Sequence, residues 1–128
     1  MKLLLDTHAL LWALAGNPKL SAVARAAIEQ EGAELLISSV SAFEITTKYR
    51  IGKLPEFAAI ARDFPDILDQ LDYSPLPVRL AHAALAGALD HSHGDPFDRL
   101  LIAQARIEGV PIVSNEALFD EFGVERVW

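Results

Sequence analysis

The sequence predicts an α/β fold of three layers, α/β/α, in which helices cover both faces of a central parallel sheet of four to five short strands. Short apolar runs alternate with helical patterns along the chain, which is typical of such a sheet. The 128 residues are 52% hydrophobic and 23% charged, which suits one domain with a real core, so we expect residues 1–128 to form a single domain. Acidic residues follow the apolar runs, at the strand ends where α/β proteins bind ligands.

The first half of the chain is expected to supply two strands and four helices. In order, we expect a strand over 2–6, helices over 7–15 and 21–30, a strand over 34–38, and helices over 39–51 and 56–70. Gly16 and Gly52 follow helical patterns and stop them. Ser21 suits the N-cap of the second helix, and Pro55 suits the opening of the fourth.

The second half continues the alternation. We expect a strand over 72–76, a helix over 78–88, a polar loop over 90–94, a helix over 96–108, a strand over 110–114, a short helix over 117–122 and a last edge strand over 124–127. The helix over 96–108 is apolar on most sides and should therefore be deeply buried.

Composition excludes several classes of protein. Without cysteine the chain has no disulfide, zinc–thiolate site or thiol nucleophile, and it is compatible with the reducing cytoplasm, where we expect it. The net charge of -7 argues against a simple basic nucleic-acid binder, but not against a nuclease whose bound cations reverse the local charge. The apolar start is interrupted by Asp6 and His8, and no segment reaches the ~18 apolar residues of a membrane span, so we expect neither signal peptide nor membrane partner.

Five acids stand beside apolar segments rather than on polar faces: Asp6, Glu44, Asp95, Asp98 and Glu116. A carboxylate next to core-forming sequence is costly unless it is paired or binds a metal. Asp6 and Glu116 follow strands and the pair at 95–98 begins a helix, so these acids can converge at one sheet edge. Hard carboxylate oxygens select Mg²⁺ or Mn²⁺, ions that polarise a phosphate and activate a water for phosphodiester cleavage.

The acids of the first half also have structural interpretations. Asp6 could cap the helix that follows it, although Thr7 could do so instead. Glu44 fits a capping box with Ser41 or an i,i+4 pair with Lys48, and local sequence does not decide between these roles and metal ligation.

The acids of the second half differ in character. Asp95 suits a helix N-cap better than a ligand position, whereas Asp98 enters an almost wholly apolar helix and is the better metal candidate. Glu116 begins a short helix, where an acid is favoured by the helix dipole. Its neighbours Ser114 and Asn115 could hydrogen-bond a ligand, a water or a metal hydrate.

The histidines and a basic cluster complete the list of candidates. His91 and His93 form an H-x-H pair, which we expect to be solvated because no further imidazole or thiolate completes a zinc set. His8 and His82 are expected to be structural. The basic cluster 48–53 either contacts phosphate or pairs with solvent and the helix dipole.

Four segments carry a resemblance to a known family: Leu3–Trp12, Ser41–Leu54, His93–Ala105 and Ile112–Trp128. In this order and at this length they are similar to the motifs of the PIN-domain ribonucleases, in particular the VapC-type toxins of prokaryotic toxin–antitoxin pairs. The resemblance covers essentially the whole chain and implies a PIN-like α/β/α fold and a single PIN domain.

The resemblance also implies a site. Asp6, Glu44 and Asp98 would be the central metal-binding and catalytic acids, with Asp95 nearby and Glu116 as a fourth acid where the family usually has Asp. Five further residues are expected to contact the substrate: Thr7, Ser114, Asn115, Lys48 and Arg99. The two basic residues among them are alternatively structural partners.

The function implied is Mg²⁺- or Mn²⁺-dependent endonucleolytic cleavage of RNA by the toxin of a type II toxin–antitoxin system. A cognate antitoxin would block the acidic cleft, and a homodimer is expected. Two alternatives remain: a PIN-fold binding module with a degraded site, for which Glu116 is the motivating departure, and a PIN nuclease that is not a toxin. A phosphatase or receiver-like phosphoacceptor using Asp6 lacks an evident second acid or lysine close to it.

Overall fold

One parallel sheet organises the molecule. The computed structural model describes residues 1–128, apart from the side chain of Glu56. The strands are β1 (Lys2–Leu5), β2 (Glu34–Ser38), β3 (Ser74–Leu76), β4 (Ile112–Val113) and β5 (Arg126–Val127). All neighbouring pairs are parallel, in the order β3-β2-β1-β4-β5. The predicted central parallel sheet of four to five short strands is thus confirmed.

Helices connect each strand to the next. The α-helices are α1 (Thr7–Ala15), α2 (Ala22–Glu29), α3 (Ser39–Arg50), α4 (Ala58–Arg62), α5 (Phe64–Gln70), α6 (Leu80–Ala88) and α7 (Pro96–Glu108). Two 3₁₀ segments, η1 (Pro55–Phe57) and η2 (Ala117–Phe122), complete the chain. Within the part of the chain that the structure describes, no helix combines the length and the apolar character needed to cross a membrane.

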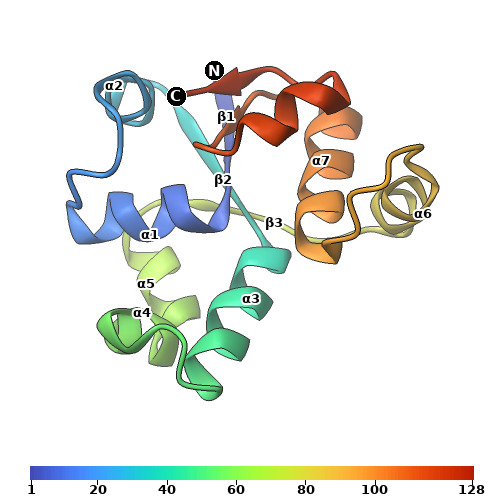
Figure 1. Ribbon diagram of the computed structural model, residues 1–128. Coiled ribbons are helices and arrows are strands. Elements are labelled where there is room, and N and C mark those ends of the chain that lie inside the picture. Colours follow the sequence, from blue (N-terminus) through green and yellow to red (C-terminus); the bar gives the residue numbers. More distant parts are fainter.

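Successive side chains of β1 point to opposite faces of the sheet. Leu3 and Leu5 join a core cluster with α1, α2, α4 and α5, whereas Leu4 joins a second cluster with α6, α7 and η2. Figure 1 shows the first group of helices and the pair α6–α7 on opposite sides of β1 and β2. All three leucines are fully buried, and each such side chain contributes roughly 1.5–3 kcal/mol.

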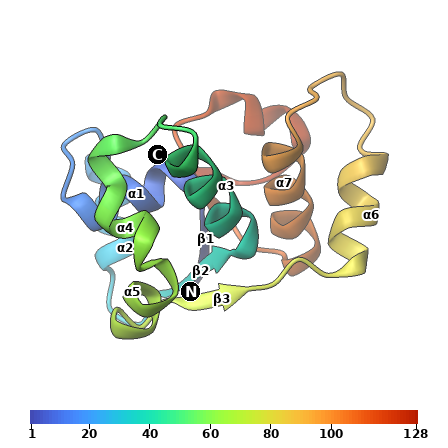
Figure 2. The ribbon, with the colours of Figure 1, turned by 90° about the horizontal axis from the view of Figure 1, so that it is seen from below.

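The register aligns the carboxyl ends of the central strands. Leu5 is opposite both Ile37 and Val113, so the residues after these strands emerge at one edge of the sheet. Helices α1 and α3 begin at this edge, directly after β1 and β2. Figure 2 shows α3 standing between the α1–α4–α5 side and the α7–α6 side. The edge is therefore surrounded by helix starts, whose dipoles favour acidic groups.

The single helix expected over 56–70 is wrong. The chain instead forms η1, α4 and α5, with a break at Asp63 (φ -113°, ψ 28°). Pro65 lies in the first turn of α5. A continuous helix would lose the hydrogen bond that Pro65 cannot donate, and the proline ring would clash with the carbonyl of Ala61.

Candidate functional site

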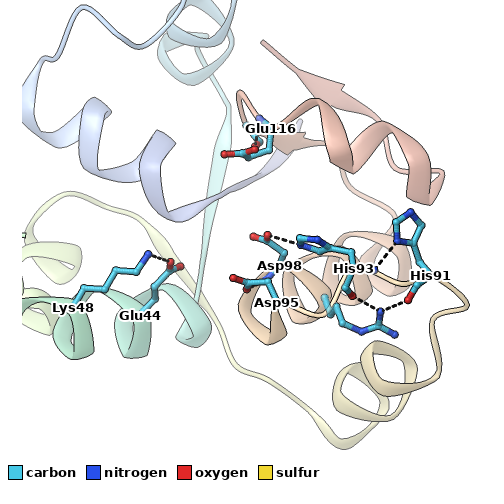
Figure 3. Close-up of polar contacts among 9 residues, drawn as sticks. Glu44, Lys48, His91, His93, Asp95, Asp98 and Glu116 are labelled. Carbon is cyan, nitrogen blue, oxygen red and sulfur yellow. Dashed lines mark hydrogen bonds and ion pairs between the residues drawn. The ribbon is translucent and has the colours of Figure 1, made fainter. Parts of the chain in front are cut away.

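A pocket of about 190 Å³ lies at the carboxyl edge of the sheet, and all five acids predicted from the sequence line it. Thr7, His8 and Lys48 contribute to the same lining. Its volume is below the roughly 300 Å³ of typical small-molecule sites, so it suits a hydrated ion or a phosphate oxygen better than a whole nucleotide. Glu44 on α3 and Asp95 and Asp98 on α7 point toward one another in Figure 3.

Asp6 links β1 to α1 and is the most buried acid of the pocket, with 5% of its surface exposed. Its backbone N–H donates to the carbonyl of Val113, and its Oδ1 accepts from the N–H of Ala9 at 2.8 Å. Burial raises the pKa of Asp6 to about 6, and the charges of Asp98 and Glu116 add to the rise, against lowering by Ser114 and Ala9. Asp6 is therefore the N-cap of α1, and Thr7 does not take that role. The hydrogen bonds to Asp6 offset only part of the cost of burying its charge.

Glu44 lies in α3 and has two partners, Thr7 on α1 and Lys48 on its own helix. Its Oε1 accepts a hydrogen bond of 2.6 Å from the hydroxyl of Thr7, and its Oε2 pairs with Lys48. Thr7 has one hydroxyl proton, so the hydroxyl of Ser41 donates to Thr7 across 3.0 Å. The helix is capped by Ser38, whose Oγ accepts from the N–H of Val40, and the alternative capping box of Ser41 and Glu44 is wrong.

Asp95 and Asp98 occupy the start of α7. Asp95 is the N-cap, and its Oδ1 accepts from the backbone N–H of Asp98 at 3.0 Å, which confirms its capping role. Asp98 lies one turn inside and contacts the Nε2 of His93 at 2.9 Å. Burial raises the pKa of Asp98, and the nearby charges of Asp95 and Glu44 act in the same direction, whereas His93 opposes them.

Of the three residues that follow β4, only Glu116 lines the pocket. Glu116 is exposed but lines the pocket, and its backbone N–H donates to the Oγ of Ser114. Ser114 is fully buried and acts on the pocket through Asp6. Asn115, expected to contact the substrate, is exposed and lies outside the residues that line the pocket.

Arg99, also expected to contact the substrate, binds backbone carbonyls of the loop that precedes α7. Its guanidinium donates to the carbonyls of Ala86, Leu89, His91 and His93 at 2.6–3.0 Å. These four bonds use most of its five donors, and Arg99 does not line the acidic pocket. These contacts favour the structural alternative for Arg99.

The four histidines differ in their surroundings. His82 is structural as predicted: it is fully buried, accepts from the N–H of Arg79 and contacts Glu108 at 3.2 Å. His8 is exposed at the pocket and its ring lies against Trp12, with centroids 5.5 Å apart. The H-x-H pair is partly exposed, as expected of a polar loop, but both rings also have partners in the protein. His91 lies against Phe122, with ring centroids 4.4 Å apart, and His93 contacts Asp98. The short separation of His93 and Asp98 in the sequence, five residues across the start of α7, is the feature from which this contact could have been predicted.

The donor set fits a hard divalent cation. The ligand atoms on offer are carboxylate and hydroxyl oxygens, and the pocket holds five carboxylates beside Lys48. Asp6 is buried, and none of the described side chains forms a cationic partner for it. Among the side chains that the structure describes, no three carboxylates or imidazoles yet surround one point closely enough to hold a metal ion. The chemistry therefore fits the ion, whereas ligation by three groups requires these side chains to move.

Comparison with known proteins identifies the family. The PIN domain family matches residues 3–125. Ribonuclease VapC16 of Mycobacterium tuberculosis is 39% identical over 72 residues, which cover 53% of this chain and 51% of that protein. The match thus spans about half the length of this curated relative.

Solved structures share the fold over nearly the whole chain. VapBC2 of Rickettsia felis, bound to a promoter DNA fragment, has a TM-score of 0.71 at 17% identity and covers 100% of both chains. VapBC-1 of nontypeable Haemophilus influenzae has a TM-score of 0.68 at 13% identity, with 98% of this chain and 96% of that chain covered. At these identities the likeness concerns the fold alone, and it agrees with the match over residues 3–125: the chain belongs to the PIN domain family.

Proposed function

We propose that the chain is a Mg²⁺- or Mn²⁺-dependent endoribonuclease that acts as the toxin of a type II toxin–antitoxin pair. The observation that carries this proposal is the convergence of five acids, from four separate segments of sequence, on one small pocket. Such a concentration of like charge destabilises the free protein and is explained by a ligand that is itself strongly positive. The similarity to a protein named Ribonuclease VapC16 supports RNA as the substrate.

Asp6 and Asp98 are the residues best suited to hold the ion directly. Both carboxyl groups have pKa values raised by burial, so both gain from a cation. Asp95 and Glu116 line the same pocket and would ligate directly or through water, and Glu44 would join after leaving Lys48. When bound, the ion polarises the scissile phosphate and lowers the pKa of an attacking water.

The remaining residues position the acids and the substrate. Thr7 holds the Oε1 of Glu44 through its hydroxyl, and the buried Ser114 orients the segment that carries Glu116. Lys48, with 31% of its side chain exposed, offers a positive charge at the pocket for a phosphate oxygen. The small pocket admits the phosphate, and the bases of the RNA lie outside it.

An antitoxin partner is supported by relatives of the same fold. A toxin–antitoxin complex from Klebsiella pneumoniae contains a chain of this fold, with a TM-score of 0.61 at 16% identity, and the match covers 88% of this chain and 85% of that chain. We accordingly propose a small cognate protein that covers the acidic pocket, and a homodimer of this chain.

Cleavage of a labelled single-stranded RNA by the purified chain tests the activity. We expect cleavage with Mg²⁺, none with EDTA and none by Asp98→Asn, which keeps the size of the side chain but removes its charge. The matched control is Asp90→Asn, an exposed acid outside the pocket, which should cleave as the wild type does. Cleavage in EDTA or by Asp98→Asn would overturn the proposed site.

Expression in a bacterial host separates a toxin from other nucleases. Growth arrest by the wild type, absent with Asp98→Asn and relieved by the neighbouring small reading frame, is the expected result. RNA cleavage without growth arrest would identify a PIN nuclease that is not a toxin. Failure to bind Mn²⁺ or to cleave RNA would leave a binding module.

A further inference from the structure

The polar loop between α6 and α7 is held in place by hydrogen bonds from one side chain, Arg99. Arg99 reaches back from α7 and donates to the carbonyls of Leu89, His91 and His93, at 2.6, 3.0 and 2.7 Å. Its Nε also donates to the carbonyl of Ala86 at the end of α6. A planar guanidinium with four such bonds fixes the path of the loop, because its donors have a rigid geometry.

His93 is fixed at both of its backbone polar groups. Its carbonyl accepts from Arg99, and its N–H donates to the Nδ1 of His91 at 3.0 Å. The ring of His91 is in turn placed against Phe122. The two histidines of the H-x-H motif thus have different roles: His91 holds the backbone of His93, and the ring of His93 points to Asp98 (Figure 3).

The ring of His93 meets Asp98 through a defined pair of atoms. Nε2 lies 2.9 Å from Oδ2, and the two side chains are 26% and 30% exposed. An ionised carboxylate only accepts hydrogen bonds, so Nε2 carries the proton and donates. The bond engages one oxygen of Asp98 and leaves Oδ1 for another partner.

We infer that His93 is a positioning residue, which orients the Asp98 carboxylate for a divalent cation by donating a hydrogen bond to Oδ2. This inference rests on the proposed function. A group that fixes a ligating carboxylate lowers the entropy lost when the ion binds, and removal of such a partner typically weakens metal affinity about 10- to 100-fold. His93 itself makes no contact with the ion or the substrate in this role.

Titration of the purified chain with Mn²⁺, followed by electron paramagnetic resonance, tests the inference. His93→Leu removes the donor and is expected to weaken Mn²⁺ binding about 10- to 100-fold. His93→Gln places an amide N–H near the former position of Nε2 and should restore most of the affinity. Ser92→Leu adds the same apolar side chain at the exposed neighbouring position and should bind Mn²⁺ as the wild type does.

RNA cleavage at saturating Mn²⁺ distinguishes positioning from direct participation. We expect kcat of His93→Leu to recover toward the wild-type value, because the ion then holds Asp98 in place. Wild-type Mn²⁺ affinity in His93→Leu, or no rescue by His93→Gln, would overturn the inference. Circular dichroism and the urea midpoint would show that each variant is folded.

The failure of the inference and that of the proposed function are distinguishable. If the wild type binds Mn²⁺ and Asp98→Asn does not, but His93→Leu binds normally, only the role of His93 is wrong. If the wild type itself binds no Mn²⁺, the proposed function fails and the inference falls with it.

Discussion

Asp6→Asn is expected to stabilise the metal-free protein at neutral pH while removing its activity. Asp6 is 5% exposed, and burial raises its pKa from 3.8 to about 6. A raised pKa in the folded state means that the charged form is better accommodated in the unfolded chain than in the native one. Asparagine has the same size, keeps an oxygen for the N–H of Ala9 and is an equally good N-cap.

The penalty depends on pH in a defined direction. Below 3.8, Asp6 is protonated in both states and does not affect stability, whereas above about 6 it is charged in both states and its full burial penalty applies. The gap between these pKa values corresponds to about 3 kcal/mol above pH 6 or so, and to roughly half of that near pH 5. Stability contributed by this residue is therefore lost as the pH rises from 3.8 through about 6.

Urea unfolding in EDTA measures the effect. We expect Asp6→Asn to exceed the wild type by about 3 kcal/mol near pH 8 and by about half as much near pH 5, with a rise in Tm on the order of 10 °C at the higher pH. Taking the difference between the two proteins at each pH removes the contribution of all other titrating groups. Added Mn²⁺ should stabilise the wild type and leave Asp6→Asn unchanged.

Asp120→Asn is the matched control because its environment has the opposite sign. Asp120 is exposed, and its hydrogen bonds to Arg126 lower its pKa. Its replacement should therefore slightly destabilise the protein near neutral pH. Equal or lower stability of Asp6→Asn near pH 8, or a difference that does not change with pH, would refute the reasoning about Asp6.

Three further predictions follow from the same contacts. Mn²⁺ affinity of the wild type should fall about tenfold for each pH unit below about 6, because Asp6 must then release a proton, and calorimetry in buffers of different ionisation enthalpy would detect that proton. Lys48→Met should bind Mn²⁺ several-fold more tightly, since it removes the cation that pairs with Glu44, and should raise the KM for RNA; unchanged values of both would contradict its assignment. Arg99→Lys should lower the free energy of unfolding by about 2–4 kcal/mol in urea titrations, because one ammonium cannot replace four hydrogen bonds to carbonyls, and a loss near zero would show that the loop does not depend on them.

The three central strands β1, β2 and β4 were predictable because each is an apolar run bounded by helical pattern. The run before Asp6 and the run over Ile112–Val113 are of this kind, and in a parallel sheet their carboxyl ends fall at one edge. The break at Asp63 was not predicted because the flanking sequence has helical composition, whereas Pro65 prevents one continuous helix through this segment.

The position of the candidate site could be predicted from the sequence because it lies at the carboxyl edge of the predicted sheet. Asp6 and Asp98 could be placed there from strand and helix boundaries alone. The partners of these acids could not, because they depend on tertiary contacts: Thr7 meets Glu44 across 37 positions of sequence. The roles of Arg99 and His93 depend on the path of an irregular loop, which hydrophobic periodicity does not specify.

A crystal of the wild type soaked in Mn²⁺ and measured at the manganese absorption edge tests the central claim most directly. We expect one anomalous peak within about 2.2 Å of carboxylate oxygens of both Asp6 and Asp98, in the pocket that Glu116 and Asp95 also line. The same peak should be absent in Asp98→Asn. A peak at His91 or elsewhere on the surface, with none between Asp6 and Asp98, would contradict the account.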